Sequence, residues 1–107
     1  MLKKEDMPIC DVATTVSILG SKWKLLIIRD LLTGPKRTGQ LMRSLEGISQ
    51  KVLTSSLKSM VSDGIVERID YQEVPPHVEY QLSPLGHTLK PTIDAMKAWG
   101  QYYKQQL

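Results

Sequence analysis

The chain has 107 residues, 41% of them hydrophobic, and a formal net charge of +3. This length suits a single domain over residues 1–107 with a small apolar core, and the positive charge favours an anionic partner. One cysteine excludes an internal disulfide framework, and no apolar run is long enough to cross a membrane, so we expect a cytoplasmic protein without a membrane partner.

The first predicted helix spans residues 11–19, where apolar residues recur at spacings of four and three. Asp11 is suited to cap its start, and Gly20 is suited to follow its end. The apolar face of this helix consists of Val12, Val16 and Leu19.

The second predicted helix spans about residues 22–33 and is apolar around most of its circumference. A helix with that pattern is a buried one, so we expect it at the centre of the core. Ser21 is suited to cap its start, and Gly34 and Pro35 end it.

Two further helices are predicted at about residues 38–45 and 50–63, joined by a tight connection at residues 46–48. Ser49 is suited to cap the later helix, and Gly64 ends it. This helix is amphipathic: Leu53, Leu57 and Met60 face inward, and the opposite face carries Gln50, Lys51, Thr54, Ser55 and Lys58.

Two strands are predicted next. Residues 65–71 are rich in β-branched side chains, and residues 78–83 alternate between apolar and polar side chains. Residues 72–77, which include two prolines, join them as a hairpin loop with His77 at its tip.

Helical periodicity returns from residue 85, and Pro91 implies either a kink or a true helix start at that point. The apolar stripe of this last helix consists of Leu89, Ile93, Met96, Trp99 and Tyr103. Four helices, a hairpin and a terminal helix predict a mainly α protein with a small β-hairpin, the layout of a winged helix-turn-helix.

The polar face of the fourth helix is the first candidate for function, because a helix fits the major groove of DNA. Gln50 can pair with adenine, and Lys51 can reach guanine. Thr54 and Ser55 can bond bases or phosphates, and Lys58 would lie near a backbone. The alternative is the solvated face that any amphipathic helix presents.

Positive charge is concentrated in the middle of the chain, where residues 35–62 carry five basic residues and one acidic residue, a net charge of +4. Lys36, Arg37 and Arg43 are candidates for phosphate contacts that fix register without reading sequence. His77 is a candidate for a phosphate or minor-groove contact. The alternative for each of these residues is an ordinary solvated surface position.

The stripe of the last helix can pack on its own domain or meet the same helix of a second copy. We favour the second copy, because a small domain has already used its other helices for the core. A two-fold dimer then requires a palindromic site with half-sites about 34 Å apart, or a multiple of that.

Cys10 lies at the start of the first predicted helix, where the helix dipole would favour the thiolate and its reaction with oxidants or electrophiles. The alternative is a small buried apolar residue. We find no metal-ligand spacing, phosphate loop or nucleophile motif, so we expect neither a cofactor nor an enzyme.

In combination, several stretches resemble the HxlR-type winged helix regulators of bacteria. They include Gly20-Ser21-Lys22-Trp23, Gly47-Ile48-Ser49-Gln50-Lys51-Val52-Leu53-Thr54, Asp63-Gly64-Ile65, Glu73-Val74-Pro75-Pro76-His77-Val78-Glu79-Tyr80 and Leu85-Gly86. The resemblance implies a dimeric transcription regulator with Ser49, Gln50, Lys51 and Thr54 on its recognition helix. Family members often carry Arg where this chain has His77.

The resemblance also implies a dimer interface made by the first and last helices, which brings in Val12 and Val16. Cys10 matches the position of a cysteine that responds to oxidants, quinones or aldehydes in some members. We therefore predict a homodimeric repressor or activator that binds double-stranded DNA, with an oxidant or small-molecule effector as an addition. The competing hypothesis is a winged-helix module that binds another protein and no DNA.

Overall fold

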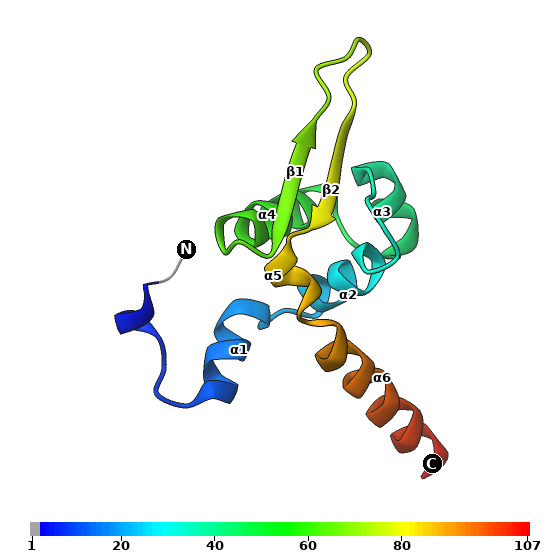
Figure 1. Ribbon diagram of the computed structural model, residues 1–107. Coiled ribbons are helices and arrows are strands. Elements are labelled where there is room, and N and C mark those ends of the chain that lie inside the picture. Colours follow the sequence, from blue (N-terminus) through cyan, green and yellow to red (C-terminus); the bar gives the residue numbers. More distant parts are fainter. Residues whose placement is uncertain (1–2) are drawn as a thin grey trace.

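The computed structural model describes residues 3–107 and confirms a mainly helical chain with one two-stranded antiparallel hairpin (Figure 1). In chain order the elements are η1 (Lys4–Asp6), α1 (Asp11–Leu19), α2 (Lys22–Leu31), α3 (Thr38–Ser44), α4 (Gln50–Ser62), β1 (Val66–Asp70), β2 (Val78–Leu82), α5 (Pro84–His87) and α6 (Lys90–Gln105).

The core is built around α2, as its apolar pattern predicts. Ile27 and Ile28 are fully enclosed, and Leu31 at the end of the helix is almost so. The hairpin, α3 and α4 close over them with a set of equally buried side chains: Leu41, Leu53, Leu57, Met60, Val66 and Leu82. The helix-turn-helix and the hairpin therefore share one core.

Helix starts follow the capping serines that the sequence predicts. The Ser21 hydroxyl accepts a hydrogen bond from the Lys24 amide at 3.3 Å, and that of Ser49 accepts one from Val52 at 3.1 Å. The predicted cap of α1 is wrong: Cys10 occupies the cap position with an extended backbone, and Asp11 is already the first helical residue.

The two strands form a wing whose base is tied to the helix-turn-helix. The Lys36 amide donates to the Tyr80 carbonyl at 2.9 Å, and the Tyr80 amide donates back to the Lys36 carbonyl at 2.8 Å. The pairing of β1 and β2 extends outward to Tyr71, whose amide donates to the His77 carbonyl at 3.0 Å. The predicted position of His77 at the tip is therefore wrong, because His77 belongs to the pair that closes the strands.

Pro91 lies in the first turn of α6, so the helix-start alternative is correct and the kink is not. A proline at that position costs the helix no hydrogen bond, because the first backbone amides of a helix have no acceptor within it. The preceding turn, α5, is capped by Ser83, whose hydroxyl accepts from the Gly86 amide at 3.0 Å.

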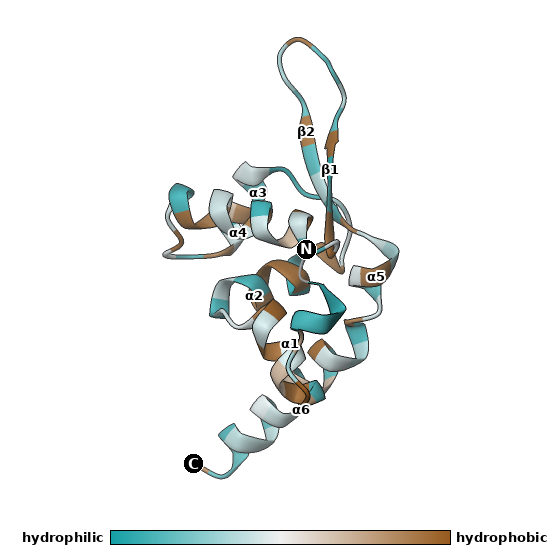
Figure 2. Cartoon of the chain, turned by 90° about the vertical axis from the view of Figure 1, so that its left-hand side faces the viewer, coloured by the Kyte–Doolittle hydropathy of each residue, from teal (hydrophilic) through white to brown (hydrophobic). Residues whose placement is uncertain are grey.

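The wing and α6 project from opposite ends of the molecule (Figures 1 and 2). The radius of gyration is accordingly 15.0 Å, against about 13 Å for a compact domain of this length. Across the described residues 3–107, no helix combines the length and the apolarity needed to cross a membrane.

Candidate nucleic-acid interface

The predicted polar face of α4 is free at the surface of the monomer. Its side chains, Gln50, Lys51, Thr54, Ser55 and Lys58, are all exposed, whereas Leu53 and Leu57 on the other face are 1% exposed. The helix therefore presents amide, hydroxyl and ammonium groups outward from a side that is locked into the core. Whether these groups contact bases stays a prediction.

Three features hold α4 in place. Gly47 has a φ of 92°, a left-handed backbone that lets the chain reverse between α3 and α4. Ile48, directly after it, is 7% exposed and packs into the core. Near the far end of α4, the Lys24 ammonium donates to the Ser59 hydroxyl at 2.8 Å, which joins α4 to α2.

A polar cleft lies between α3 and the wing and brings two of the predicted phosphate contacts together. Its walls are Arg37, Thr38, Gly39, Gln40 and Arg43 on one side, and Pro76 and Val78 on the other. Both arginines line this space, and guanidinium groups bind phosphate in a bidentate manner. The arrangement is suited to hold a backbone phosphate.

Lys36 is placed less favourably than the two arginines. Its side chain is partly buried, and its ammonium lies 3.4 Å from the Gly34 carbonyl. Gln40 plays a part that the sequence did not indicate, because its side-chain oxygen accepts from the Arg37 amide at 2.9 Å and so fixes the start of α3.

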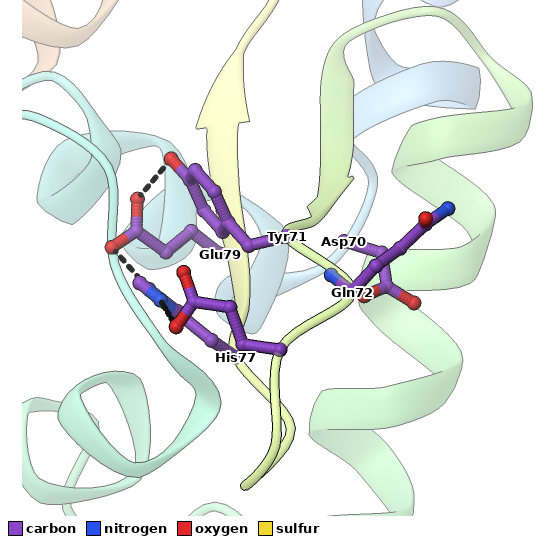
Figure 3. A network of polar contacts seen from close by, with 6 residues as sticks. Asp70, Tyr71, Gln72, His77 and Glu79 are labelled. Carbon is purple, nitrogen blue, oxygen red and sulfur yellow. Dashed lines mark hydrogen bonds and ion pairs between the residues drawn. The ribbon is translucent and has the colours of Figure 1, made fainter.

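A polar network at the base of the wing loop holds His77 (Figure 3). One carboxylate oxygen of Glu79 accepts a hydrogen bond from the Tyr71 hydroxyl at 3.0 Å. The other oxygen lies 3.0 Å from Nε2 of His77. The imidazole stacks on the Tyr71 ring with centroids 4.3 Å apart. Its Nδ1 lies 3.5 Å from a Glu73 carboxylate oxygen, and the His77 side chain is only 19% exposed.

This network perturbs the titration of two of its members. The hydrogen bond from His77, and after it that from Tyr71, lowers the pKa of Glu79 below its ordinary value. The hydrogen bond to Glu79 raises the pKa of the Tyr71 phenol. Because the pKa of Glu79 falls on folding, its stabilising contribution is present above the ordinary pKa and is lost as the pH drops through the folded value.

Neither Tyr71 nor Glu79 was a predicted site residue. The alternation along β2 was the signal that could have found Glu79, because residues two apart on a strand share a face, and Glu79 lies two beyond His77. Tyr71 could be found only by knowing that the pairing continues past the end of β1.

A second surface, apolar rather than polar, runs over α1 and α6. Val12, Val16, Met96, Trp99 and Tyr103 are all between 48% and 72% exposed, as is Tyr102, which the sequence did not indicate. Val16 and Met96 line the same shallow hollow, so the two helices share this surface. Leu89 and Ile93 differ from the rest of the predicted stripe, because they pack partly buried against their own core.

Cys10 is exposed at the cap position of α1, so the buried alternative is wrong for this residue. Its carbonyl accepts the Thr14 amide at 3.0 Å, so Cys10 lies at the N-terminal end of the helix, the positive end of its dipole. Within residues 3–107, no group of three or more His, Cys, Asp or Glu side chains is arranged to hold a metal ion.

Comparison with known proteins adds sequence and structural relatives. The HxlR-like helix-turn-helix family matches residues 18–107. YkvN, an HTH-type transcriptional regulator of Bacillus subtilis, is 41% identical over 97 residues, which cover 91% of this chain and 82% of YkvN.

Two solved structures also superpose closely. The HTH-type transcriptional regulator YtcD has a TM-score of 0.86 at 40% identity, covering 91% of this chain and 99% of YtcD. The redox regulator HypR in its oxidised form has a TM-score of 0.83 at 40% identity, covering 87% of this chain and 96% of HypR.

Proposed function

This chain belongs to the HxlR-like helix-turn-helix family of DNA-binding transcriptional regulators, and we propose that it binds a palindromic operator as a homodimer. The observation that carries the proposal is the two-sided character of α4. One face is fixed in the core, and the other exposes hydrogen-bonding and cationic side chains with no carboxylate among them. A rigid helix of that kind is suited to the major groove.

Within this proposal, contacts divide into those that read bases and those that hold the backbone. Gln50 and Lys51, in the first turn of α4, read adenine and guanine edges. The cleft between α3 and the wing takes a phosphate between Arg37 and Arg43, which sets the register. The remaining predicted contacts, to phosphates or to nearby bases, come from Lys36, Ser49, Thr54, Ser55 and Lys58. His77, also a predicted contact, has both ring nitrogens turned toward carboxylates, so we propose that it acts on DNA through the wing loop.

The exposed apolar surface of α1 and α6 forms the dimer interface in this proposal. Val12, Val16, Met96, Trp99 and Tyr103 leave a contiguous apolar surface on the monomer, which a second copy covers around a two-fold axis. The axis then places two α4 helices on half-sites about 34 Å apart, or a multiple of that.

Control through Cys10 is a further part of the proposal. Cys10 is exposed at the cap position of α1, directly before the first of the two interface helices, and HypR, a structural relative, is a redox regulator. Attack of the thiolate on a quinone or an aldehyde forms a bond to sulfur beside the dimer interface and so changes operator affinity.

Operator binding by a Lys51→Ala variant tests the proposal. Against a duplex selected from a randomised library by the wild-type protein, loss of one base-reading side chain weakens binding by about 1–3 kcal/mol. Fluorescence anisotropy at fixed salt measures this, with Lys104→Ala, at the far end of α6, as the control that leaves affinity unchanged.

Three outcomes would count against parts of the proposal. Equal affinity of wild type and Lys51→Ala removes Lys51 from the readout. Absence of any salt-dependent DNA binding favours the protein-interaction module instead. If wild type and Cys10→Ser respond equally to the aldehyde methylglyoxal, Cys10 is not the sensor.

A further inference from the structure

Four side chains connect the end of β1, the loop and β2 and are here called the wing clasp. They are Tyr71, His77 and Glu79, labelled in Figure 3, and Glu73, whose carboxylate lies near His77. Both ring nitrogens of His77 face carboxylate oxygens: Nε2 lies 3.0 Å from Glu79, and Nδ1 lies 3.5 Å from Glu73. Tyr71 completes the clasp by stacking on the ring and donating to Glu79.

This arrangement places an acceptor opposite each ring nitrogen of His77: Nε2 makes a hydrogen bond with Glu79, and Nδ1 lies at ion-pair distance from Glu73. A neutral imidazole carries one N–H group and one lone pair, whereas an ionised carboxylate only accepts hydrogen bonds. A neutral His77 can therefore bond one of its two carboxylates and must present a lone pair to the other. Only the imidazolium form turns an N–H group toward both carboxylates, so protonation adds an attractive contact with Glu73 to the hydrogen bond with Glu79.

The two states differ in the charge and the order of the wing. With neutral His77 the clasp carries two negative charges, whereas with imidazolium it carries one. The hydrogen bond from His77 lowers the pKa of Glu79, which keeps that carboxylate ionised and ready to pair. Loss of the proton removes the ion pair between His77 and Glu73, which ties the loop to the start of β2.

The charges around the clasp come from three neighbouring segments. From β1, Arg68 and Asp70 pair with each other at 3.9 Å, and Asp70 also accepts the Gln72 amide at 2.8 Å. The segment before α3 contributes Lys36, which is hydrogen-bonded to Tyr80, and Arg37, whose charge acts on Glu79. Arg43 of α3 lies across the cleft from the wing residues Pro76 and Val78.

We propose that the wing clasp is a proton-operated latch: protonation of His77 closes the wing loop and strengthens operator binding. The proposal rests on the proposed DNA-binding function for its second half. The closed state has one negative charge fewer and a pre-ordered loop. It is therefore repelled less by the phosphate backbone and loses less conformational entropy when it binds. Operator affinity therefore increases as the pH falls.

Two substitutions at position 77 separate charge from hydrogen bonding. His77→Arg keeps a permanent cation with several donors, and His77→Gln keeps one donating group without a charge. Anisotropy with the selected duplex should show wild-type binding that tightens toward low pH, by up to about tenfold per pH unit for one proton. His77→Arg should bind tightly and His77→Gln weakly, both without this pH dependence.

The chain offers a matched control in its second histidine. His87 lies exposed on α5, outside the clasp, so His87→Gln should keep the wild-type dependence on pH. Persistence of that dependence in His77→Gln, or its absence in wild type, would overturn the latch.

A measurement on the free protein keeps the latch testable without DNA. Amide hydrogen exchange of residues 72–76, corrected for its intrinsic pH dependence, should be slower at about pH 6 than at about pH 8 in wild type. His77→Gln should show equal protection at both values. If no variant binds DNA, the proposed function fails while exchange still decides the latch; pH-independent protection in wild type would overturn it.

Discussion

The helices α4 and α6 carry the same kind of amphipathic pattern but cover their apolar faces in different ways. In α4, Leu53, Leu57 and Met60 are all 1% exposed. In α6, no residue between positions 90 and 105 is buried, and Trp99 is 64% exposed. Helical periodicity thus shows that a face will be covered, and it does not show whether the cover comes from the same chain.

The difference arises from direction rather than composition. α4 lies against α2 and the hairpin, whereas α6 makes contact with the body near Ile93 and then runs away from it (Figure 2). Trp99 and Tyr103, whose rings stack with centroids 5.3 Å apart, lie on the part of α6 beyond that contact. One helix therefore stabilises the fold, and the other is available for association.

The largest effect is expected at the buried face of α4. Leu57→Ala removes a fully buried side chain and leaves a cavity, so it should lower the free energy of unfolding by about 2–5 kcal/mol. Denaturant unfolding at fixed protomer concentration measures this. Lys58→Ala, on the exposed face one residue later, should change it by less than about 0.5 kcal/mol. Equal effects of the two would remove the distinction between the faces.

A smaller effect is expected at α6, and on a different equilibrium. Trp99→Ala should weaken dimerisation by about 2 kcal/mol, roughly 30-fold in Kd, because large aromatic side chains dominate interfaces. Sedimentation equilibrium measures the dimer, and Gln101→Ala on the same helix serves as the control. A dimer unaffected by Trp99→Ala would place the interface elsewhere.

The smallest effect on stability is expected at the helix starts, where α4 and α6 also differ. α4 begins at Ser49, whose side chain accepts a backbone amide, whereas α6 begins at Leu89 without any side-chain cap. Ser49→Ala should therefore lower the free energy of unfolding by about 1 kcal/mol. Thermal unfolding compares it with Ser44→Ala, at the exposed end of α3, and a loss no greater than that of this control would contradict the role of the cap.

Local signals explain why most of the fold could be predicted from the sequence. Ser21 and Ser49 mark helix starts, Gly47 and Gly64 mark reversals, and the alternation of the second strand sets its faces. Each of these acts within a few residues, so each can be recognised without knowing the fold. Pro91 left two alternatives, and the separate turn α5 before the start of α6 decides between them.

The features that could not be predicted depend on residues distant in the chain or on the orientation of whole elements. The orientation of His77 depends on Tyr71, which faces it across the hairpin. The difference in burial between Ile93, which packs on the core, and Trp99, which is exposed, depends on the angle at which α6 leaves the rest of the domain. Neither the spacing of residues nor the charge of a segment carries that information.

The pair of backbone hydrogen bonds between Lys36 and Tyr80 has a consequence for how this protein can change in evolution. One residue inserted between Gly34 and Lys36 would shift that pairing by one position and turn α3 away from its neighbours. Residues 72–76 lie beyond all strand pairing, so insertions there lengthen the wing and leave the helix pair undisturbed. The reach of the protein along a duplex can thus be altered independently of the bases it reads.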